Sequence, residues 1–146
     1  LMILHQGNKS IEFTIVNYQY PERKSTEEGF DYDANWLICE VKYLDADRNE
    51  TYKDACILTD ELADMAEEFS KILDGTEDGY SSDFMEPCFK VTAARANEKI
   101  VMTFQFVYDT TGGLWLDRKI TTLLSKEEAT EVVHELRELM RKYQVR

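Results

Sequence analysis

The chain has 146 residues, a length typical of one folded domain, and we predict a single domain over residues 1–146. It carries 29 acidic and 17 basic side chains, a net charge of −12. This charge disfavours nucleic acid and anionic membranes as partners, because both would repel it, and it favours a basic protein partner.

The N-terminal residues and the cysteines both favour a cytoplasmic protein. Residues 1–13 have neither the basic start nor the long apolar run of a signal peptide. The three cysteines, Cys39, Cys56 and Cys88, are widely spaced and set among apolar residues. We therefore expect buried, reduced thiols, which are typical of the cytoplasm.

Alternating apolar residues predict three strands in the first part of the chain. Residues 11–20 place Ile11, Phe13 and Ile15 on one face. In residues 36–44, the inward face of the predicted strand is formed by Leu37, Cys39, Val41 and Tyr43. The charged segment 22–35 is predicted to be a loop, and the turn at 45–50 pairs 36–44 with 51–57 as an antiparallel hairpin.

A three-stranded meander is predicted further on. Residues 88–95 lead through a turn at 96–98 into a strand whose inward face carries Met102, Phe104, Phe106 and Tyr108. Glycines in the turn at 109–113 accept positive φ, and residues 114–123 return as the last strand.

Two amphipathic helices interrupt and end this pattern. Thr59 or Asp60 is expected to cap the first, which ends at Asp74-Gly75. Its apolar stripe is Leu62, Met65, Ala66, Phe69, Ile72 and Leu73. The second begins with a capping box of Ser125 and Glu128, flanked by the Leu124–Ala129 staple. Its stripe is Val132, Val133, Leu136, Leu139, Met140 and Tyr143.

The predicted order is β-β-β-α-β-β-β-α. Hairpins dominate it, and the alternating βαβ pattern of parallel sheets is absent. We therefore predict an α+β fold, with a mainly antiparallel sheet of about six strands and two helices.

Motifs for metals and catalysis are few. Asp45, Asp47 and Asn49 resemble the start of a calcium loop, but its glycine and its bidentate glutamate are replaced by Glu50 and Cys56. An acidic hairpin turn explains the same residues.

The positions of the histidines and the absence of nucleophile motifs also give no support for an enzyme. His5 lies near a terminus expected to fray, and His134 and Glu138 lie one turn apart on a charged helix face. The chain has no P-loop, G-x-S-x-G or G-x-G-x-x-G motif. We expect no metal, cofactor or catalytic residue, and a binding protein in preference to an enzyme.

The acidic residues are concentrated in one segment. Residues 60–86 hold ten acids and one base, Lys71, a net charge of −9, whereas residues 125–146 hold five of each sign. Such a surface speeds encounter with a basic partner, although acids that are only solvated remain the alternative. The candidate partner-binding residues are Asp64, Glu67, Glu68, Glu77, Asp78, Tyr80 and Asp83. Four tyrosines lie among these and other acids and are possible anchors for a partner: Tyr18, Tyr20, Tyr32 and Tyr80. The alternative is that these tyrosines cover the edges of the sheet.

The strings YDANWLICEVKYLD, ETYKDACILTDEL and FMEPCFKV resemble the WapI-type immunity proteins of bacteria over about residues 8–143. The resemblance rests on Asp33, Trp36 and Leu37, on Leu58 and Thr59, and on Glu86 and Pro87. It implies a small cytoplasmic inhibitor that neutralises the toxin domain of a cell-wall-associated, contact-dependent polymorphic toxin. The implied toxin is a nuclease acting on RNA, and the family needs no catalytic residues.

Two other classes of function stay open at this point. A small-ligand protein or enzyme would hold a pocket in a curved sheet, lined by Trp36, Phe104, Phe106 and Trp115. A structural or assembly subunit would show a large exposed apolar patch.

Overall fold

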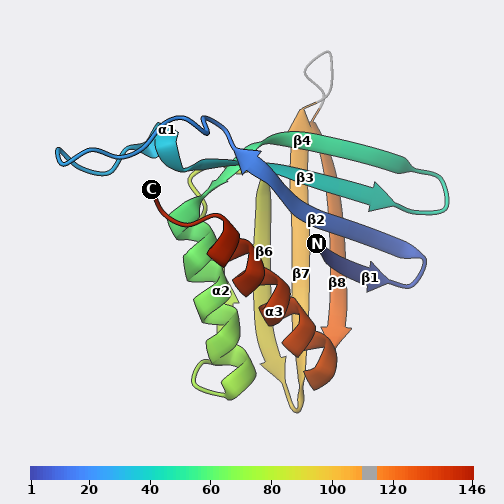
Figure 1. Cartoon of the computed structure of the whole chain (residues 1–146). Coiled ribbons are helices and arrows are strands. Elements are labelled where there is room, and N and C mark those ends of the chain that lie inside the picture. Colours follow the sequence, from blue (N-terminus) through green and yellow to red (C-terminus); the bar gives the residue numbers. More distant parts are fainter. Residues whose placement is uncertain (110–114) are drawn as a thin grey trace.

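The structure, a computed structural model, describes residues 1–109 and 115–146 and is α+β (Figure 1). Within these residues, eight strands form two four-stranded antiparallel sheets, ordered β1-β2-β3-β4 and β5-β6-β7-β8. Figure 1 shows the strands of the two sheets running in different directions, with α2 and α3 side by side next to the second sheet.

The first sheet is built from the N-terminal hairpins, and its strands are β1 (Met2–Gln6), β2 (Lys9–Tyr18), β3 (Trp36–Leu44) and β4 (Asn49–Leu58). The predicted inward residues of β2 and β3 are buried, which confirms the alternation read from the sequence. The loop between β3 and β4 is closed by the backbone N–H of Asp45, which donates to the carbonyl of Arg48 at 2.9 Å.

The second sheet contains the predicted meander, and its strands are β5 (Gly79–Ser81), β6 (Phe89–Ala96), β7 (Lys99–Asp109) and β8 (Trp115–Leu124). Met102, Phe104 and Phe106 of β7 are buried as predicted. Residues 110–113 of the predicted turn at 109–113 lie outside the described residues. The side chains of Tyr108 and Trp115 also lie outside them.

Three helices occur in the described residues, α1 (Tyr32–Asn35), α2 (Thr59–Asp74) and α3 (Lys126–Lys142). Gly75 ends α2 at φ +88°, a left-handed conformation that favours glycine. The capping box of α3 is confirmed, because Ser125 Oγ accepts from the N–H of Glu128 and the Glu128 carboxylate accepts from the N–H of Ser125, both at 3.1 Å.

The predicted counts of six strands and two helices are wrong, because three short elements escaped the sequence pattern. The N-terminus is not frayed: β1 pairs with β2 through a turn at Gly7, and Met2 and Leu4 are buried. The short strand β5 lies between the end of α2 and β6, where no strand was predicted. Helix α1 lies within the predicted loop 22–35, where the Asp31 carboxylate accepts from the N–H of Asp33 at 3.0 Å.

The predicted cap of α2 is also wrong. The N-cap residue is Leu58, whose backbone N–H donates to the Glu61 carboxylate at 2.9 Å. The hydroxyl of Thr59 is buried and instead donates to Oδ1 of Asn35 at 2.6 Å. Thr59, one of the two residues predicted to cap the helix, therefore makes a tertiary hydrogen bond instead.

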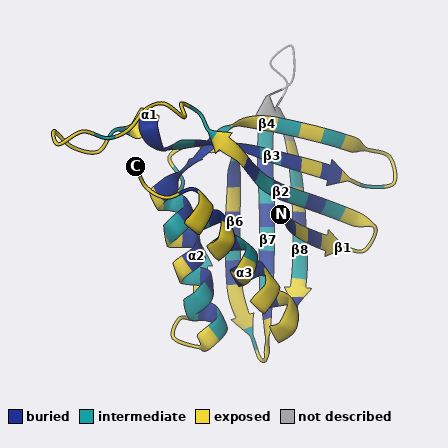
Figure 2. Cartoon of the chain, viewed as in Figure 1, coloured by how far each residue is buried: buried dark blue, intermediate teal, exposed yellow. Residues whose placement is uncertain are grey.

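One hydrophobic cluster joins both sheets and both long helices. Phe13 of β2 meets Phe89 of β6 and Phe104 of β7, with ring centroids 5.4 and 5.7 Å apart. Figure 2 shows buried residues recurring along the strands of both sheets and along α2. The two sheets are thus held together by side-chain packing between their facing surfaces.

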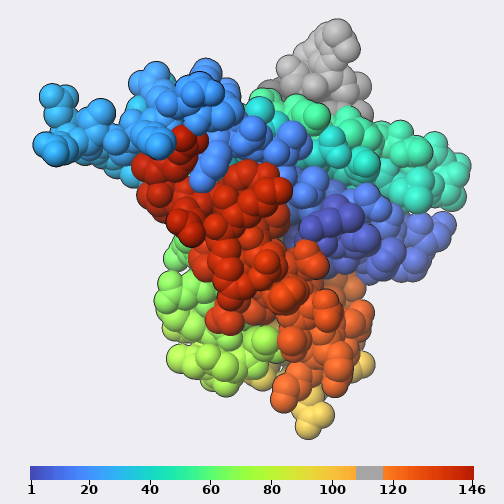
Figure 3. Space-filling view, in the orientation of Figure 1, coloured from blue at the N-terminus to red at the C-terminus, as the bar shows by residue number. Residues whose placement is uncertain are grey.

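An arm of residues 20–35, which ends in α1, projects from this body, and the C-terminal residues lie against its base (Figure 3). Asn35 contacts Arg146 through two hydrogen bonds, of 2.9 and 2.8 Å. The Arg146 side chain donates to the carbonyl of Pro21 at 2.6 Å. The base of the arm is therefore fixed to the C-terminal segment that follows α3.

Candidate protein-binding surface

The acids of residues 60–86 extend from the exposed face of α2 into the segment that follows it. We call this region the acidic surface: Asp60, Glu61, Asp64, Glu67, Glu68, Asp74, Glu77, Asp78, Asp83 and Glu86. The helix orients its share of them because its apolar stripe is buried against the core, which turns the intervening polar positions outward.

Tyr80 links α2 to β5 within this surface. Its ring packs edge-on against Phe69 of α2, with centroids 5.8 Å apart, and it is half-buried. Burial raises the pKa of the Tyr80 hydroxyl, and the negative charges of Asp64, Glu61 and Glu68 raise it further. Three carboxylates of α2 are therefore near enough to Tyr80 for their charges to act on its hydroxyl.

A second group of acids surrounds Lys71, the one base of the segment. The ammonium of Lys71 lies 3.1 Å from Glu68 and 3.8 Å from Glu67. The hydrogen bond to Glu68 raises the pKa of Lys71, and the charges of Glu68, Glu67 and Glu77 add to this effect. One ammonium among three carboxylates leaves the group with a net negative charge.

The remaining two candidates occupy different places. Asp83 is exposed, and its charge acts on Glu61, one of the carboxylates that act on Tyr80. Asp78 is exposed just before β5, where its backbone carbonyl accepts from the N–H of Arg95 at 2.8 Å. Asp78 thus lies directly before β5, two residues ahead of Tyr80, and its backbone is bonded to β6.

Glu61 has a role in this surface that sequence reasoning missed. Its carboxylate accepts from the N–H of Leu58 at 2.9 Å and from the N–H of Met85 at 2.8 Å. It thereby fixes the loop that carries Asp83 and Glu86 to the start of α2. The capping role of Glu61 could have been predicted from its position as the third residue of the helix, because a glutamate there commonly accepts a hydrogen bond from the N-cap backbone.

Replacing Glu61 with alanine is expected to lower the free energy of unfolding by about 1–2 kcal/mol, because two backbone donors lose a charged acceptor. Urea denaturation measures this change. The matched control is Glu67→Ala, since Glu67 is exposed and forms an ion pair of 3.8 Å with Lys71 in place of backbone hydrogen bonds such as those of Glu61. We expect the control to change stability by less than about 0.5 kcal/mol. Equal losses in the two variants would contradict the role given to Glu61.

The other tyrosines named as possible anchors divide into two kinds. Tyr18 is half-buried, donates to the carbonyl of Gln144 at 2.7 Å and lies under the Arg146 guanidinium, so it is structural. Tyr20 and Tyr32, on the arm, are 47% and 52% exposed. Beside them Phe30, which sequence reasoning missed, is 43% exposed and packs edge-on against Tyr32 at 5.0 Å. The arm therefore presents a preformed aromatic cluster to solvent.

The arm is held rigid behind these rings. Arg23 pairs with Asp31 at 2.7 Å and with Asp33 at 3.6 Å. The N–H of Asp31 donates to Oγ of Ser25 at 3.0 Å, and Ser25 in turn contacts the backbone of Arg146. An exposed aromatic pair on a braced support loses little conformational entropy on binding, which is a property of good contact residues.

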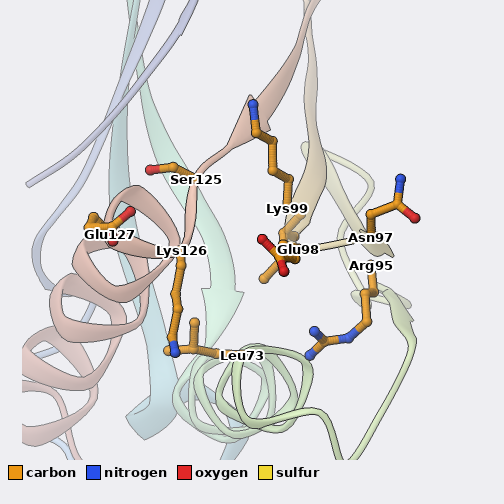
Figure 4. Close-up of a pocket in the computed structure, with 9 residues that line it drawn as sticks. Leu73, Arg95, Asn97, Glu98, Lys99, Ser125, Lys126 and Glu127 are labelled. Atoms are coloured by element: carbon orange, nitrogen blue, oxygen red, sulfur yellow. The ribbon is translucent and has the colours of Figure 1, made fainter.

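A cavity of about 540 Å³ lies between the ends of α2 and α3 and the β6–β7 turn (Figure 4). Its charged residues are of both signs, Arg95, Lys99 and Lys126 with Glu98 and Glu127. Arg95 donates to the carbonyl of Ile72, and Ser125 caps α3. These two polar side chains of its wall therefore serve the ends of the helices.

The aromatic pocket considered from sequence is not formed by the residues expected to line it. Phe104 and Phe106 are fully buried and pack on Phe89 and Tyr52, so they fill the core. Trp36 is half-buried, and the side chain of Trp115 lies outside the described residues.

Asp45, the first residue of the candidate calcium motif, is engaged in other contacts. The Asp45 carboxylate accepts from Tyr43 Oη and from the N–H of Asp47, both at 2.8 Å, and pairs with Arg48. In the described ranges no three residues among His, Cys, Asp and Glu form a group able to hold a metal ion. No helix among the described residues has the length and apolarity required to cross a membrane.

A comparison with protein families gives this architecture its context. Residues 2–144, nearly the whole chain, match the model of the immunity protein WapI-like family. No individually curated protein is significantly similar to the chain. The match spans both sheets and both long helices, and the chain belongs to the WapI-like family of immunity proteins.

Proposed function

We propose that this protein binds and neutralises a cognate toxin domain in the cytoplasm by stoichiometric contact, and that the toxin is a basic nuclease. The observation that carries the proposal is the concentration of charge: residues 60–86 hold −9 of the net charge of −12. Nucleases are basic where they hold phosphate groups, so an acidic inhibitor is attracted to the site that it must block. Membership of an immunity protein family supports a toxin as the partner.

Co-expression tests the function directly. Where the gene immediately upstream encodes a large secreted protein, the probe is the C-terminal domain of that protein, expressed in cells with and without this chain. Survival only in the presence of the chain supports the proposal. Cell death despite soluble expression of both proteins would overturn it for that pair.

Reversing Glu67, Glu68 and Asp78 to lysine is expected to slow association with the toxin domain by about tenfold or more at low salt, because long-range attraction is lost. The salt dependence of the association rate should flatten at the same time. Stopped-flow or surface-binding kinetics at several salt concentrations measure both effects.

The matched control reverses three exposed acids outside the acidic surface, Asp47, Glu98 and Glu131. It changes the net charge by the same amount. A larger effect from the first set locates the contact on the acidic surface, and equal effects would show that only the total charge matters.

Replacing Phe30 and Tyr32 together with alanine is expected to weaken toxin binding by about 2 kcal/mol or more, mainly through faster dissociation. The reason is that both rings are exposed yet preformed on a braced arm. The control is Leu123→Ala, an apolar side chain of β8 with similar exposure (51%). Unchanged dissociation in the arm variant would exclude the arm from the interface while leaving the acidic surface untouched.

A further inference from the structure

Met85 is an apolar side chain that the fold leaves in water. It is 58% exposed, the highest value among the large apolar side chains whose exposure the structure describes. The other methionines differ from it, because Met2, Met65 and Met102 are buried and Met140 packs partly buried against the core. An exposed methionine adds little to stability, whereas methionine is enriched in protein–protein interfaces.

The segment between β5 and β6, residues 82–88, carries Met85, and we call it the Met85 loop. The backbone N–H of Met85 donates to the Glu61 carboxylate at 2.8 Å. At the start of the loop, the N–H of Ser82 donates to the carbonyl of Val91, and the N–H of Val91 donates to Ser82 Oγ, both at 2.9 Å. The loop therefore presents an exposed apolar side chain on a fixed backbone, so little conformational entropy is lost when a partner covers it.

A groove of about 330 Å³ lies beside the Met85 loop. The loop contributes Phe84 to the groove, and the Phe84 ring packs edge-on against Phe89 with centroids 5.0 Å apart. Strands β6 and β7 contribute Lys90 and Val107. The groove is therefore lined in part by apolar side chains, and one of its walls is the loop that carries Met85.

The Met85 loop belongs to the acidic surface. Asp83 and Glu86 lie in the loop and are exposed, and Glu61 of α2 is bonded to the Met85 backbone. Lys90, in the wall of the groove, is the nearby base. Three carboxylates against one ammonium leave this patch with a net negative charge. A patch that is apolar and negative is complementary to a partner surface that is apolar and positive.

We propose that Met85 is the apolar anchor of the contact with the toxin domain, covered by an apolar patch of that domain bordered by lysine or arginine side chains. This inference rests on the proposed function and adds to it the residue that determines how long the complex lasts. Charges act over long distances and set the association rate. An apolar side chain is buried only in the bound state, and its burial therefore slows dissociation.

Oxidation footprinting tests the contact in the unaltered, full chain. The chain alone and its complex with the toxin domain used for co-expression receive the same brief pulse of hydroxyl radicals, and peptide mass spectrometry measures the sulfoxide of each methionine. Met85 should be the most readily oxidised methionine of the free chain, and its oxidation should fall several-fold in the complex. Equal oxidation of Met85 in the free chain and in a saturated complex would overturn the proposal.

Variants of Met85 test its effect on the lifetime of the complex. Met85→Ala is expected to dissociate from the toxin domain about tenfold faster or more, with an association rate within about twofold of the wild-type value. Met85→Leu retains an apolar side chain of similar volume and should dissociate at close to the wild-type rate. The matched control is Leu44→Ala, which truncates an apolar side chain of β3 with 48% exposure.

The failure of this inference and the failure of the proposed function give different results. A wild-type chain that does not bind the toxin domain would overturn the proposed function. A wild-type chain that binds, together with a Met85→Ala variant that dissociates at the wild-type rate, would overturn the role of Met85 alone. Urea denaturation of Met85→Ala should match that of the wild-type chain, because the side chain is largely in water, and this match excludes unfolding as the cause of faster dissociation.

Discussion

Replacing Phe13 with alanine is expected to lower the free energy of unfolding by about 3–5 kcal/mol, the range for a fully buried phenylalanine. Phe13 is 0% exposed and contacts Phe89 and Phe104 of the other sheet. Its removal leaves a cavity between the two sheets, where aromatic neighbours on strands have little freedom to collapse into the space. Urea denaturation monitored by tryptophan fluorescence measures the loss.

The control for Phe13 is Ile3→Ala on the neighbouring strand β1. Ile3 is 43% exposed, so its truncation removes little buried surface and should cost less than about 1 kcal/mol. A Phe13→Ala protein with stability close to that of the control would show that the two sheets do not depend on this aromatic contact.

Replacing Asn35 with aspartate is expected to cost about 3–5 kcal/mol at neutral pH, because the change places an unpaired charge in the core. Asn35 is 0% exposed, and its amide nitrogen donates to the carbonyls of Asp31 and Arg146, at 2.8 and 2.9 Å. Its amide oxygen accepts from the hydroxyl of Thr59 at 2.6 Å and from the N–H of Arg146 at 2.8 Å. A carboxylate retains the two accepted bonds but points an oxygen at two carbonyls.

The loss of stability in the Asn35→Asp variant should increase with pH. Burial raises the pKa of the new carboxyl in the folded state above its unfolded value of about 3.9. The penalty is therefore smallest below about pH 4, grows as the pH rises from the unfolded-state pKa to the folded-state pKa, and is complete above the latter. Denaturation at low and neutral pH measures this difference relative to the wild-type chain.

Asn35→Ala serves as the uncharged reference. It removes all four hydrogen bonds without adding a charge, so its cost relative to the wild-type chain should show no such pH dependence. Equal pH profiles for the two variants would contradict the buried environment assigned to Asn35.

Elements with strong local patterns were predictable. The strand at 36–44 has the predicted bounds, since its inward residues recur at every second position from Leu37 to Tyr43. The start of α3 was predictable from Ser125 and Glu128, and the end of α2 from Gly75. In each case the signal lies within a few residues of the element that it defines.

Short elements were not predictable, because their conformation depends on partners distant in sequence. β5 has three residues and is a strand because it pairs with β6. β1 has only two buried side chains, and its pairing requires the turn at Gly7. The start of α2 was misread at Thr59, whose hydroxyl bonds a side chain 24 residues away.

The candidate surface likewise combines features that the sequence predicts with features that depend on tertiary structure. The sequence by itself determined that acids gather in residues 60–86, and it contained the pattern of the immunity protein family. Only the tertiary structure packed Tyr80 against Phe69 of α2 and joined Glu61 to the loop at Met85. The reason is physical: charge and periodicity are local properties of a chain, whereas a contact between two elements depends on how the whole core packs.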